Sequence, residues 1–464
     1  MVRDIQIDNT ISRALTGLLF SALLSGCVTQ RARTASPERE DACQLTSAVT
    51  IPKFNDATKA ALRVKLEDMV DRGFAPGVQM IVKQKGETVF SYTYGFADRE
   101  DQRKLGEDAM FRIYSMTKPI TSIVTLQLVD EGKISLDDPV ADYVSEFAKA
   151  KVFDPSGEPV SVKRDVTIRD LLTHQAGIIY GVQAKTSVGS GYSAAGIPAG
   201  PLFAPPPRDG RSKVGSLAEM AHRIATIPLA NQPGEKFTYG NALDVLGRVI
   251  EIATGKPLAD VFRDRIFIPL KMEDTGFYVA ADKAKRLTSA YIEPVQFKKQ
   301  YPGVMNAAPT ELLQPSHQTK TDDDSSSVFL LQPSIPFGGA GLVSTAKDYL
   351  RFTEAVKRDV RESSAILVSR ASAAAMAGNR LTQSSMAEAQ MLEGLGFGYG
   401  FAVKVKETAA APTFPQCGMF WSGFGSTYFW IDPAGDTSGV MMTQVFRGNV
   451  KSYWHEIMEE LYTP

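Results

Sequence analysis

The stretch YSMTKPITSIVTLQLVDEG, residues 114–132, joins a serine and a lysine to an apolar helical pattern. Apolar residues recur at helical spacing from about Ile120 to Asp130, and Gly132 is a typical stop signal. In a helix, positions i and i+3 lie on one face with Cβ atoms about 5–6 Å apart. The spacing therefore predicts that Ser115 and Lys118 face the same pocket.

The chemistry of this pair depends on the protonation state of the lysine. A serine hydroxyl is a weak nucleophile until a base removes its proton. The amine of Lys118 can be that base only when neutral, so we expect burial or a nearby cation to lower its pKa. The start of the helix favours negative charge on an oxyanion. The spacing is common by chance, and an ordinary helix start with a solvated lysine is the alternative.

A second candidate motif is Tyr239-Gly240-Asn241, which follows Pro233-Gly234-Glu235. A phenol beside an ammonium can relay a proton, and an amide can orient a lysine and donate to a substrate carbonyl. The alternative is a simple turn before the helix predicted from Ala242.

A third candidate is Trp421-Ser422-Gly423-Phe424, at the start of a β-rich segment. A backbone N–H beside a glycine on a strand can supply an oxyanion donor, and losing one such donor costs about 10²–10³ in rate. The alternative is a buried aromatic residue at a β-bulge.

Together, the order and separation of the three motifs resemble those of the penicillin-recognising serine hydrolases, in particular the class C β-lactamase-like group. The resemblance covers roughly residues 56–462. Further stretches that look like this family are THQAGI (173–178), PGEKFTYGNALDVLGRVIE (233–251), PLKMEDTGF (269–277), GGAGLVSTAKDYLRF (338–352) and WSGFGSTYFWIDP (421–433).

The resemblance implies a role for each motif residue. Ser115 is the acylated nucleophile and Lys118 its base, while Tyr239 relays the proton and activates the deacylating water. Asn241 positions Lys118 and the substrate, and the backbone N–H groups of Ser115 and Phe424 form the oxyanion hole. No metal or cofactor is implied.

The sequence departs from the family at the third motif. The resemblance implies that Trp421, Ser422 and Gly423 contact substrate. They stand where a β-lactamase has Lys-Thr-Gly, whose lysine supplies a cation for a substrate carboxylate. An indole offers one N–H and no charge. A Trp-x-Gly motif is similar to that of the family VIII carboxylesterases, which implies short-chain ester substrates. A β-lactamase or DD-peptidase remains the alternative, and a non-catalytic envelope binding protein is a lesser one.

Other functional classes find little support in the sequence. An α/β-hydrolase would need G-x-S-x-G, which does not occur. His174 is read as a satisfied structural residue. The chain has four histidines and a net charge of −1 from 51 basic and 52 acidic residues, so neither a multi-histidine metal site nor nucleic-acid binding is indicated. The expected partner is a small-molecule ester or lactam, and the oligomeric state is left open.

The order of elements predicts an α+β fold. Strand patterns lie near both ends of the chain and helical patterns in the middle, which suggests an antiparallel β-sheet with edges from both ends, flanked by helices and carrying an inserted helical subdomain. We expect the hydrolase domain at 54–464, with the helical subdomain and lid loops at about 140–335. The segments 181–215 and 319–327 are expected to be loops. Thr345 is expected to cap the helix that follows it, with Asp348 in the acidic position of a capping box. Expected strands include 78–82, 88–94, 397–405, 426–431 and 439–445, and expected helices include 54–73, 216–227, 242–254, 258–266 and 451–461.

The N-terminus resembles a bacterial lipoprotein signal. The apolar run Ala14–Gly26 is short for a membrane span and ends at Cys27, in the lipobox-like tetrad LSGC. We expect residues 1–26 to be a signal peptide and 27–53 a flexible tether, with Cys27 lipidated. The mature protein would then be an exported bacterial lipoprotein on the periplasmic side of the envelope.

Some features of the N-terminus leave choices open. Val28, rather than an aspartate, after the lipidated cysteine favours the outer membrane. An ordinary secretory signal or an uncleaved anchor, which Arg31 and Arg33 keep open, is the alternative. Cys43 and Cys417 either form a disulfide or stay unpaired.

Overall fold

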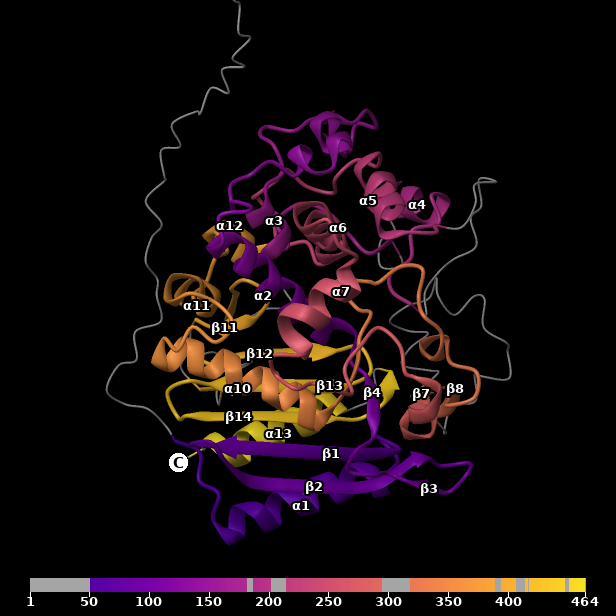
Figure 1. Cartoon of the computed structure of the whole chain (residues 1–464), viewed down its shortest axis with the longest axis vertical. Helices are drawn as coiled ribbons and strands as arrows, with labels where there is room; N and C mark the ends of the chain where they lie inside the picture. The colour runs from indigo at the N-terminus through magenta and orange to yellow at the C-terminus, as the bar shows by residue number, and fades with distance from the viewer. Residues whose placement is uncertain are drawn as a thin grey trace, which may run out of the picture. The chain divides into compact units, whose positions relative to one another are not determined.

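An eight-stranded antiparallel sheet lies at the centre of the computed structural model (Figure 1). The structure describes residues 51–463 except 182–186, 202–213, 294–317, 389–393, 406–413, 416 and 447–449. In spatial order the strands are β10 (Leu395–Phe397), β11 (Ala402–Lys404), β12 (Met419–Gly423), β13 (Thr427–Asp432), β14 (Thr437–Met442), β1 (Gly77–Gln84), β2 (Glu87–Asp98) and β3 (Arg103–Lys104).

The two ends of the chain meet inside this sheet. β1 pairs with β14, with Ile81 opposite Val440, so one edge strand comes from the N-terminal part and the other from the C-terminal part. The β1–β2 hairpin turns at Lys85 and Gly86, both at positive φ, which a tight hairpin requires. The predicted α+β fold with an antiparallel sheet is confirmed.

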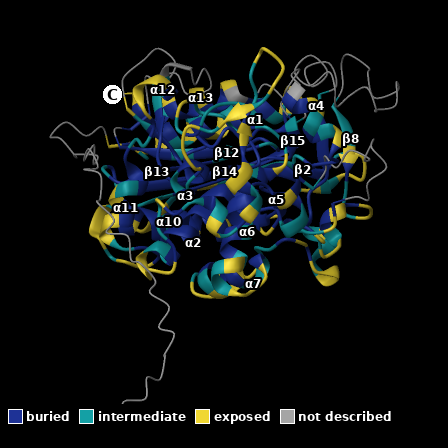
Figure 2. Cartoon of the chain, turned by 90° about the horizontal axis from the view of Figure 1, so that it is seen from above, coloured by how far each residue is buried: buried dark blue, intermediate teal, exposed yellow. Residues whose placement is uncertain are grey.

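Strand alternation divides the core into two layers. Met80 and Trp430 point to one face, which α1 (Asp56–Asp71) and α13 (Val450–Tyr462) cover. Their neighbours Ile81 and Phe429 point to the other face, where the larger cluster lies. The central strands are therefore buried on both faces (Figure 2).

Helices on the second face carry the candidate site. α10 (Ala346–Glu362) packs along β13 and β14, while α2 (Thr117–Asp130) packs against α6 (Ala242–Thr254). Thr345 accepts a hydrogen bond from the Asp348 amide, which confirms the expected N-cap of α10.

The region predicted as a helical subdomain, about 140–335, contains helices and short strands. Its helices are α3 (Ile168–Leu172), α4 (Ser187–Ala194), α5 (Leu217–Ala225), α6 and α7 (Leu258–Phe262), and its strands are β5 (Lys151–Val152), β6 (Val160–Ser161), β7 (Ala290–Ile292) and β8 (Thr319–Asp322). Other short elements include β4 (Met110–Arg112), β9 (Val343–Thr345), β15 (Val445–Phe446), α11 (Arg370–Ala377) and α12 (Gln383–Glu388).

Three local predictions were wrong. The polar segment 319–327 was expected as a loop, yet its first residues form β8 against β7. The expected strand 397–405 is two strands, because the chain turns at Gly400, which has φ 89°. The loop predicted at 181–215 contains α4 among its described residues.

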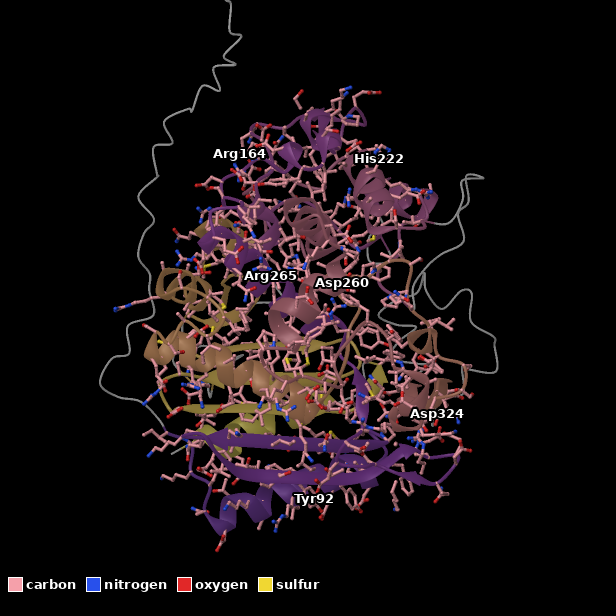
Figure 3. The ribbon with its side chains drawn as sticks, in the orientation of Figure 1. Tyr92, Arg164, His222, Asp260, Arg265 and Asp324 are labelled. Atoms are coloured by element: carbon pink, nitrogen blue, oxygen red, sulfur yellow. The ribbon has the colours of Figure 1, made fainter. Side chains whose placement is uncertain are left out.

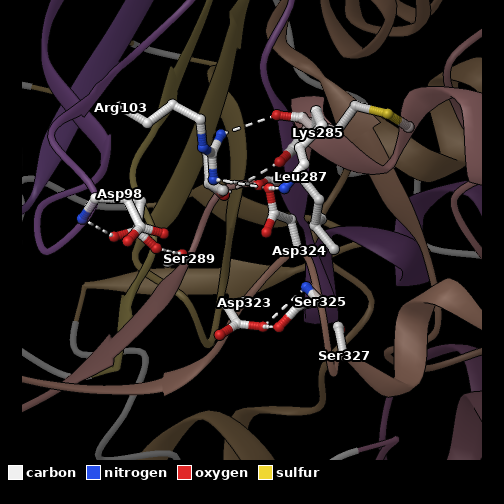
Figure 4. Close-up of polar contacts among 12 residues, drawn as sticks. Asp98, Arg103, Lys285, Leu287, Ser289, Asp323, Asp324, Ser325 and Ser327 are labelled. Carbon is white, nitrogen blue, oxygen red and sulfur yellow. Dashed lines mark hydrogen bonds and ion pairs between the residues drawn. The ribbon is translucent and has the colours of Figure 1, made fainter.

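Polar contacts join the sheet edge to the segments that flank β7 and β8 of the small three-stranded sheet (Figure 4). Arg103 on β3 donates to the carbonyls of Lys285 and Leu287 and lies 3.6 Å from Asp324. Below it, Ser289 donates to Asp98. These contacts hold β3 and Asp98 in place. Both precede β4, which leads into the turn Tyr114–Met116.

Many charged side chains lie at the periphery of the described chain (Figure 3). Arg164 and His222 lie at the helical end, paired with Asp170 and Glu146, while Tyr92 lies at the opposite end, by β2. An exposed pair such as His222–Glu146 contributes about 0–1 kcal/mol. The Arg164–Asp170 pair differs, because Asp170 is buried and accepts two hydrogen bonds from Arg164.

The expected signal peptide, 1–26, and nearly all of the tether, 27–53, lie outside the described residues, as do Cys27 and Cys43. Cys417 is disulfide-bonded. Within the described part of the chain, no helix has the length and apolar character needed to span a bilayer.

Candidate active site

Ser115 and Lys118 lie side by side, as the sequence spacing predicted. Ser115 lies in the 3-10 turn Tyr114–Met116, which runs directly into α2. The Nζ atom of Lys118 is 3.1 Å from the Ser115 Oγ atom. Ser115 keeps partial exposure, whereas Lys118 is fully buried. The nucleophile is thus open to a substrate and the candidate base is shielded from water.

The hydrogen bonds of Lys118 fit an ammonium, whose three N–H groups can donate to three oxygens, and they also fit a neutral amine. Besides Ser115, Nζ lies 2.6 Å from the Gly339 carbonyl oxygen and 3.0 Å from the Tyr180 hydroxyl. A neutral amine has two N–H donors and one lone pair. The carbonyl can only accept, so one N–H goes to Gly339, the second can go to Tyr180, and the lone pair is left for the Ser115 proton.

Opposing effects act on the pKa of Lys118. Burial lowers it, but the attraction of the Tyr180 and Tyr239 phenolates outweighs burial and raises it above the ordinary value of lysine. Burial also raises the pKa of Tyr180, so that phenol keeps its proton at neutral pH and its attraction is then absent. The net direction for Lys118 is opposite to the fall in pKa that the sequence analysis expected, and only the effect of burial acts in the expected sense.

Tyr239 lies in an aromatic wall next to the pair. The Lys118 Nζ atom lies 4.7 Å from the Tyr239 ring centroid. The Tyr239 ring is 5.6 Å from those of Tyr180 and Trp421 and 4.7 Å from that of His174. The structure thus brings the second motif to the nucleophile and adds Tyr180, which the sequence analysis missed. Its position two residues after THQAGI was the one available signal.

No hydrogen bond joins Asn241 to Lys118 among the described residues, so the direct positioning of Lys118 that the resemblance implies is not seen. Its Nδ2 atom donates to the Asp244 carboxylate at 2.8 Å and to the Pro198 carbonyl at 3.2 Å. Asn241 precedes α6, and Asp244 lies in the first turn of that helix, which brings the two side chains together. The Oδ1 atom of Asn241 has no partner among the described residues.

The third motif reaches the site through the β12–β13 hairpin. Trp421 is buried and its ring lies 5.1 Å from that of Phe397 and 5.6 Å from that of Tyr239. Its indole N–H has no partner within the described chain. Trp421 therefore forms part of the aromatic wall around Tyr239, and its indole N–H is available to donate a hydrogen bond.

Ser422 lies on the opposite face of β12, which contradicts its predicted contact with substrate. Successive side chains of a strand point to opposite faces. Ser422 is paired with Tyr428, whose ring stacks on Trp454 of α13, away from Trp421. The predicted contact of Ser422 with substrate is therefore not seen, because Ser422 is one residue along the strand from Trp421 and its side chain points to the opposite face.

Gly423 and Phe424 bring the hairpin against the nucleophile turn. A Cβ atom on Gly423 would lie 2.3 Å from the Ile113 carbonyl oxygen, so only glycine fits there. The Phe424 and Tyr114 rings are 6.0 Å apart. The approach brings the backbone around Phe424 to the turn that carries Ser115, as an oxyanion hole made by these two N–H groups requires.

His174 is fully buried, but it is not satisfied as expected. Neither ring nitrogen has a hydrogen-bond partner among the described residues. Burial, together with the nearby Lys118, holds the pKa of His174 well below its ordinary value. The imidazole is therefore neutral and packs as an aromatic ring between Phe237, Tyr239 and Phe397. No cluster that could hold a metal ion occurs among the residues that the structure describes.

The fold and the serine–lysine pair define a serine hydrolase. The chain belongs to the Beta-lactamase family, whose model matches residues 62–460. Esterase EstB of Burkholderia gladioli is 33% identical over 417 residues, covering 86% of this chain and 94% of EstB. Protein Rv1367c of Mycobacterium tuberculosis is 30% identical over 392 residues, covering 82% and 88%. In fold, the chain matches EstCE1, a hydrolase with promiscuous acyltransferase activity, with a TM-score of 0.71 at 24% identity, over 88% of this chain and 100% of EstCE1.

Proposed function

We propose that the protein hydrolyses short-chain carboxylic esters through an acyl-enzyme on Ser115. The observation that carries this proposal is the aromatic wall of Trp421 and Tyr239 beside Lys118, the hydrogen-bond partner of Ser115. An indole carries no positive charge and so cannot form an ion pair with a substrate carboxylate, but it suits an uncharged acyl or alcohol group. The spare N–H of Trp421 can donate to an ester oxygen. The similarity to Esterase EstB supports the same substrate class.

The proposed mechanism uses the contacts of Lys118. Neutral Lys118 takes the Ser115 proton as Oγ attacks the ester carbonyl, and the backbone N–H groups of Ser115 and Phe424 stabilise the oxyanion. The carbon–oxygen bond to the alcohol then breaks, and the proton passes to the leaving alkoxide by way of Tyr239. In deacylation, a water gives a proton to Tyr239 as its oxygen attacks the acyl carbonyl, while the hydroxyl proton of Tyr239 passes to neutral Lys118. The carbon–oxygen bond to Ser115 then breaks, Lys118 returns the proton to Ser115 Oγ, and the acid leaves.

The substrate class gives the first prediction. We expect p-nitrophenyl acetate or butyrate to be turned over far better than nitrocefin. The reason is that Trp421 stands where a β-lactamase has the lysine that binds the substrate carboxylate. Steady-state kcat/KM values for both compounds measure this, with Ser115→Ala as the inactive control. Faster turnover of nitrocefin would identify a β-lactamase instead, and cleavage of a D-Ala-D-Ala peptide would identify a DD-peptidase.

The activation of Ser115 gives the second prediction. A fluorophosphonate probe should label Ser115, because its hydroxyl faces an amine 3.1 Å away and is open to the solvent side. Mass spectrometry of the labelled peptide locates the adduct, and Ser115→Ala is the control. Folded protein that takes up no label would favour the non-catalytic binding protein.

For the location of the protein, we propose an exported lipoprotein anchored through Cys27, on the periplasmic side of the outer membrane. The lipobox-like tetrad supports this, and so does the disulfide at Cys417, because disulfides persist in oxidising compartments. An alkyne fatty acid fed to expressing bacteria should label the wild type and not Cys27→Ala. Equal labelling of both, or no labelling of either, would contradict the anchor.

A further inference from the structure

Asp244 is a buried carboxylate close to the candidate base that none of the proposed catalytic steps uses. Its side chain is 1% exposed, in the first turn of α6. One carboxylate oxygen accepts the Gly339 backbone N–H at 2.8 Å, and the other accepts the Asn241 amide at 2.8 Å. Both partners are N–H donors, so the group is bonded as an ionised carboxylate, at a helix N-terminus where negative charge is favoured.

Gly339 links Asp244 to Lys118. The N–H of Gly339 points to Asp244, and its carbonyl oxygen accepts from Lys118 Nζ at 2.6 Å. A Cβ atom on Gly339 would lie 3.1 Å from the nearer Asp244 oxygen, so a side chain there would crowd the carboxylate. One glycine residue therefore connects the carboxylate and the amine through two hydrogen bonds.

The segment around Gly339 is held between two helices. On the α2 side, Thr121 donates to the Gly338 carbonyl at 2.5 Å, and the Leu342 N–H donates to Thr117 Oγ1 at 3.1 Å. On the α6 side, Asp244 holds Gly339, and Gly338 lies so close to the Leu243 carbonyl that a Cβ atom there would be 2.5 Å from it. The position of the acceptor for Lys118 is thus set by both helices.

We propose that Asp244 is a positioning residue, which holds the Gly339 carbonyl that orients Lys118 toward Ser115 and supplies a buried negative charge to that amine. This inference rests on the proposed role of Lys118 as the base. The family motifs do not explain it, because Asn241, which the resemblance places beside Lys118, instead binds Asp244. Asn241 is thus connected to Lys118 only indirectly: Asn241 donates to Asp244, Asp244 accepts the Gly339 N–H, and the Gly339 carbonyl accepts from Lys118.

The titratable groups that face Lys118 decide how its charge responds to pH. They are Tyr180 and His174, which follow α3, Tyr239 before α6, and Asp244 within α6. Burial raises the pKa of Asp244, while the Asn241 hydrogen bond and the charge of Lys118 oppose that rise. A negative Asp244 favours the ammonium form of Lys118. Removing this charge should therefore let Lys118 lose its proton at lower pH.

The test is the rate of fluorophosphonate labelling of Ser115 as a function of pH, which requires an activated serine and no knowledge of the substrate. In the wild type the rate should rise to a plateau as Lys118 becomes neutral. Asp244→Asn should lower the plateau roughly ten- to hundredfold, as expected for losing a hydrogen bond to a charged group. Its midpoint should move to lower pH by on the order of one unit, as expected for a unit charge several ångströms away.

Matched variants separate charge from position. Asp244→Glu keeps the charge and displaces the oxygens, so its plateau should fall while its midpoint stays near that of the wild type. Asp359→Asn removes another buried carboxylate, which accepts backbone N–H groups beyond α10, and should change neither quantity. Asp244→Ala, which adds no amide donor, replaces Asp244→Asn if that variant does not fold.

The outcomes are distinguishable. A lowered plateau with an unmoved midpoint in both Asp244→Asn and Asp244→Ala would show a merely structural residue and overturn the proposal, as would an unchanged plateau. A wild-type protein that takes up no label would overturn the proposed function itself. Labelling of the wild type without ester turnover would leave the role of Asp244 supported and remove only the substrate class.

Discussion

Lys118→Arg should abolish nearly all ester hydrolysis, with kcat/KM falling by about 10²–10⁴, the range that a general base contributes. A guanidinium stays protonated at any pH the protein tolerates, so it cannot take the Ser115 proton. It also cannot reproduce the three contacts of Nζ with Ser115, Tyr180 and Gly339. Steady-state kinetics from pH 6 to 10 measures the loss, which should not be recovered at the alkaline end.

The chain offers a matched control for this substitution. Lys357 is also buried, at 2% exposure, but it pairs with Glu354 and Asp436 in and beside α10. Lys357→Arg keeps both ion pairs within reach and should leave kcat/KM near the wild-type value. Substantial activity in a folded Lys118→Arg protein would show that another group, Tyr180 or Tyr239, acts as the base.

Gly423→Ala should lower kcat/KM by on the order of a hundredfold, through the oxyanion hole. The added Cβ atom would lie 2.2 Å from Thr427 Oγ1 and 2.3 Å from the Ile113 carbonyl oxygen. The hairpin must then move away from the turn that carries Ser115. Overpacking of this kind also costs about 1–3 kcal/mol of stability, so the melting temperature should fall as well.

The control for Gly423 is a glycine with room around it. A Cβ atom on Gly215 would meet nothing closer than the Glu219 carboxylate, at 3.6 Å, so Gly215→Ala should be neutral in both assays. For each variant, kcat/KM for p-nitrophenyl butyrate and the melting temperature are measured on the same protein preparation. Full activity in a folded Gly423→Ala protein would show that this close approach does not set the oxyanion donors.

Elements with local signals were predictable from the sequence. The helix expected at 242–254 is α6 with the same bounds, because its apolar spacing and the following Gly255 both mark it. The turn between β1 and β2 was predictable from Gly86. This residue has a positive φ, which glycine adopts without strain. The pairing of Ser115 with Lys118 was predictable because one helical turn fixes it.

Contacts between distant segments were not predictable in this way. Tyr180, Asp244 and Gly339 meet around Lys118 from separate parts of the chain, and no periodicity relates them. The orientation of Ser422 depends on which face of β12 lies toward the helices, which tertiary packing decides. The polar run that contains β8 became a strand because β7 offered it a partner.

The pairing of β1 with β14 has a consequence for how the chain acquires its structure. Residues 77–84 cannot complete their hydrogen bonding until residues 437–442 have been synthesised, more than 350 positions later. Such distant partners slow folding, because a long loop must close before the contact forms. While the chain emerges, β1 and β2 form a hairpin with one unsatisfied side that can pair with other chains. We therefore expect nascent protein to depend on chaperones, and removal of β14 to yield aggregates rather than a smaller folded unit.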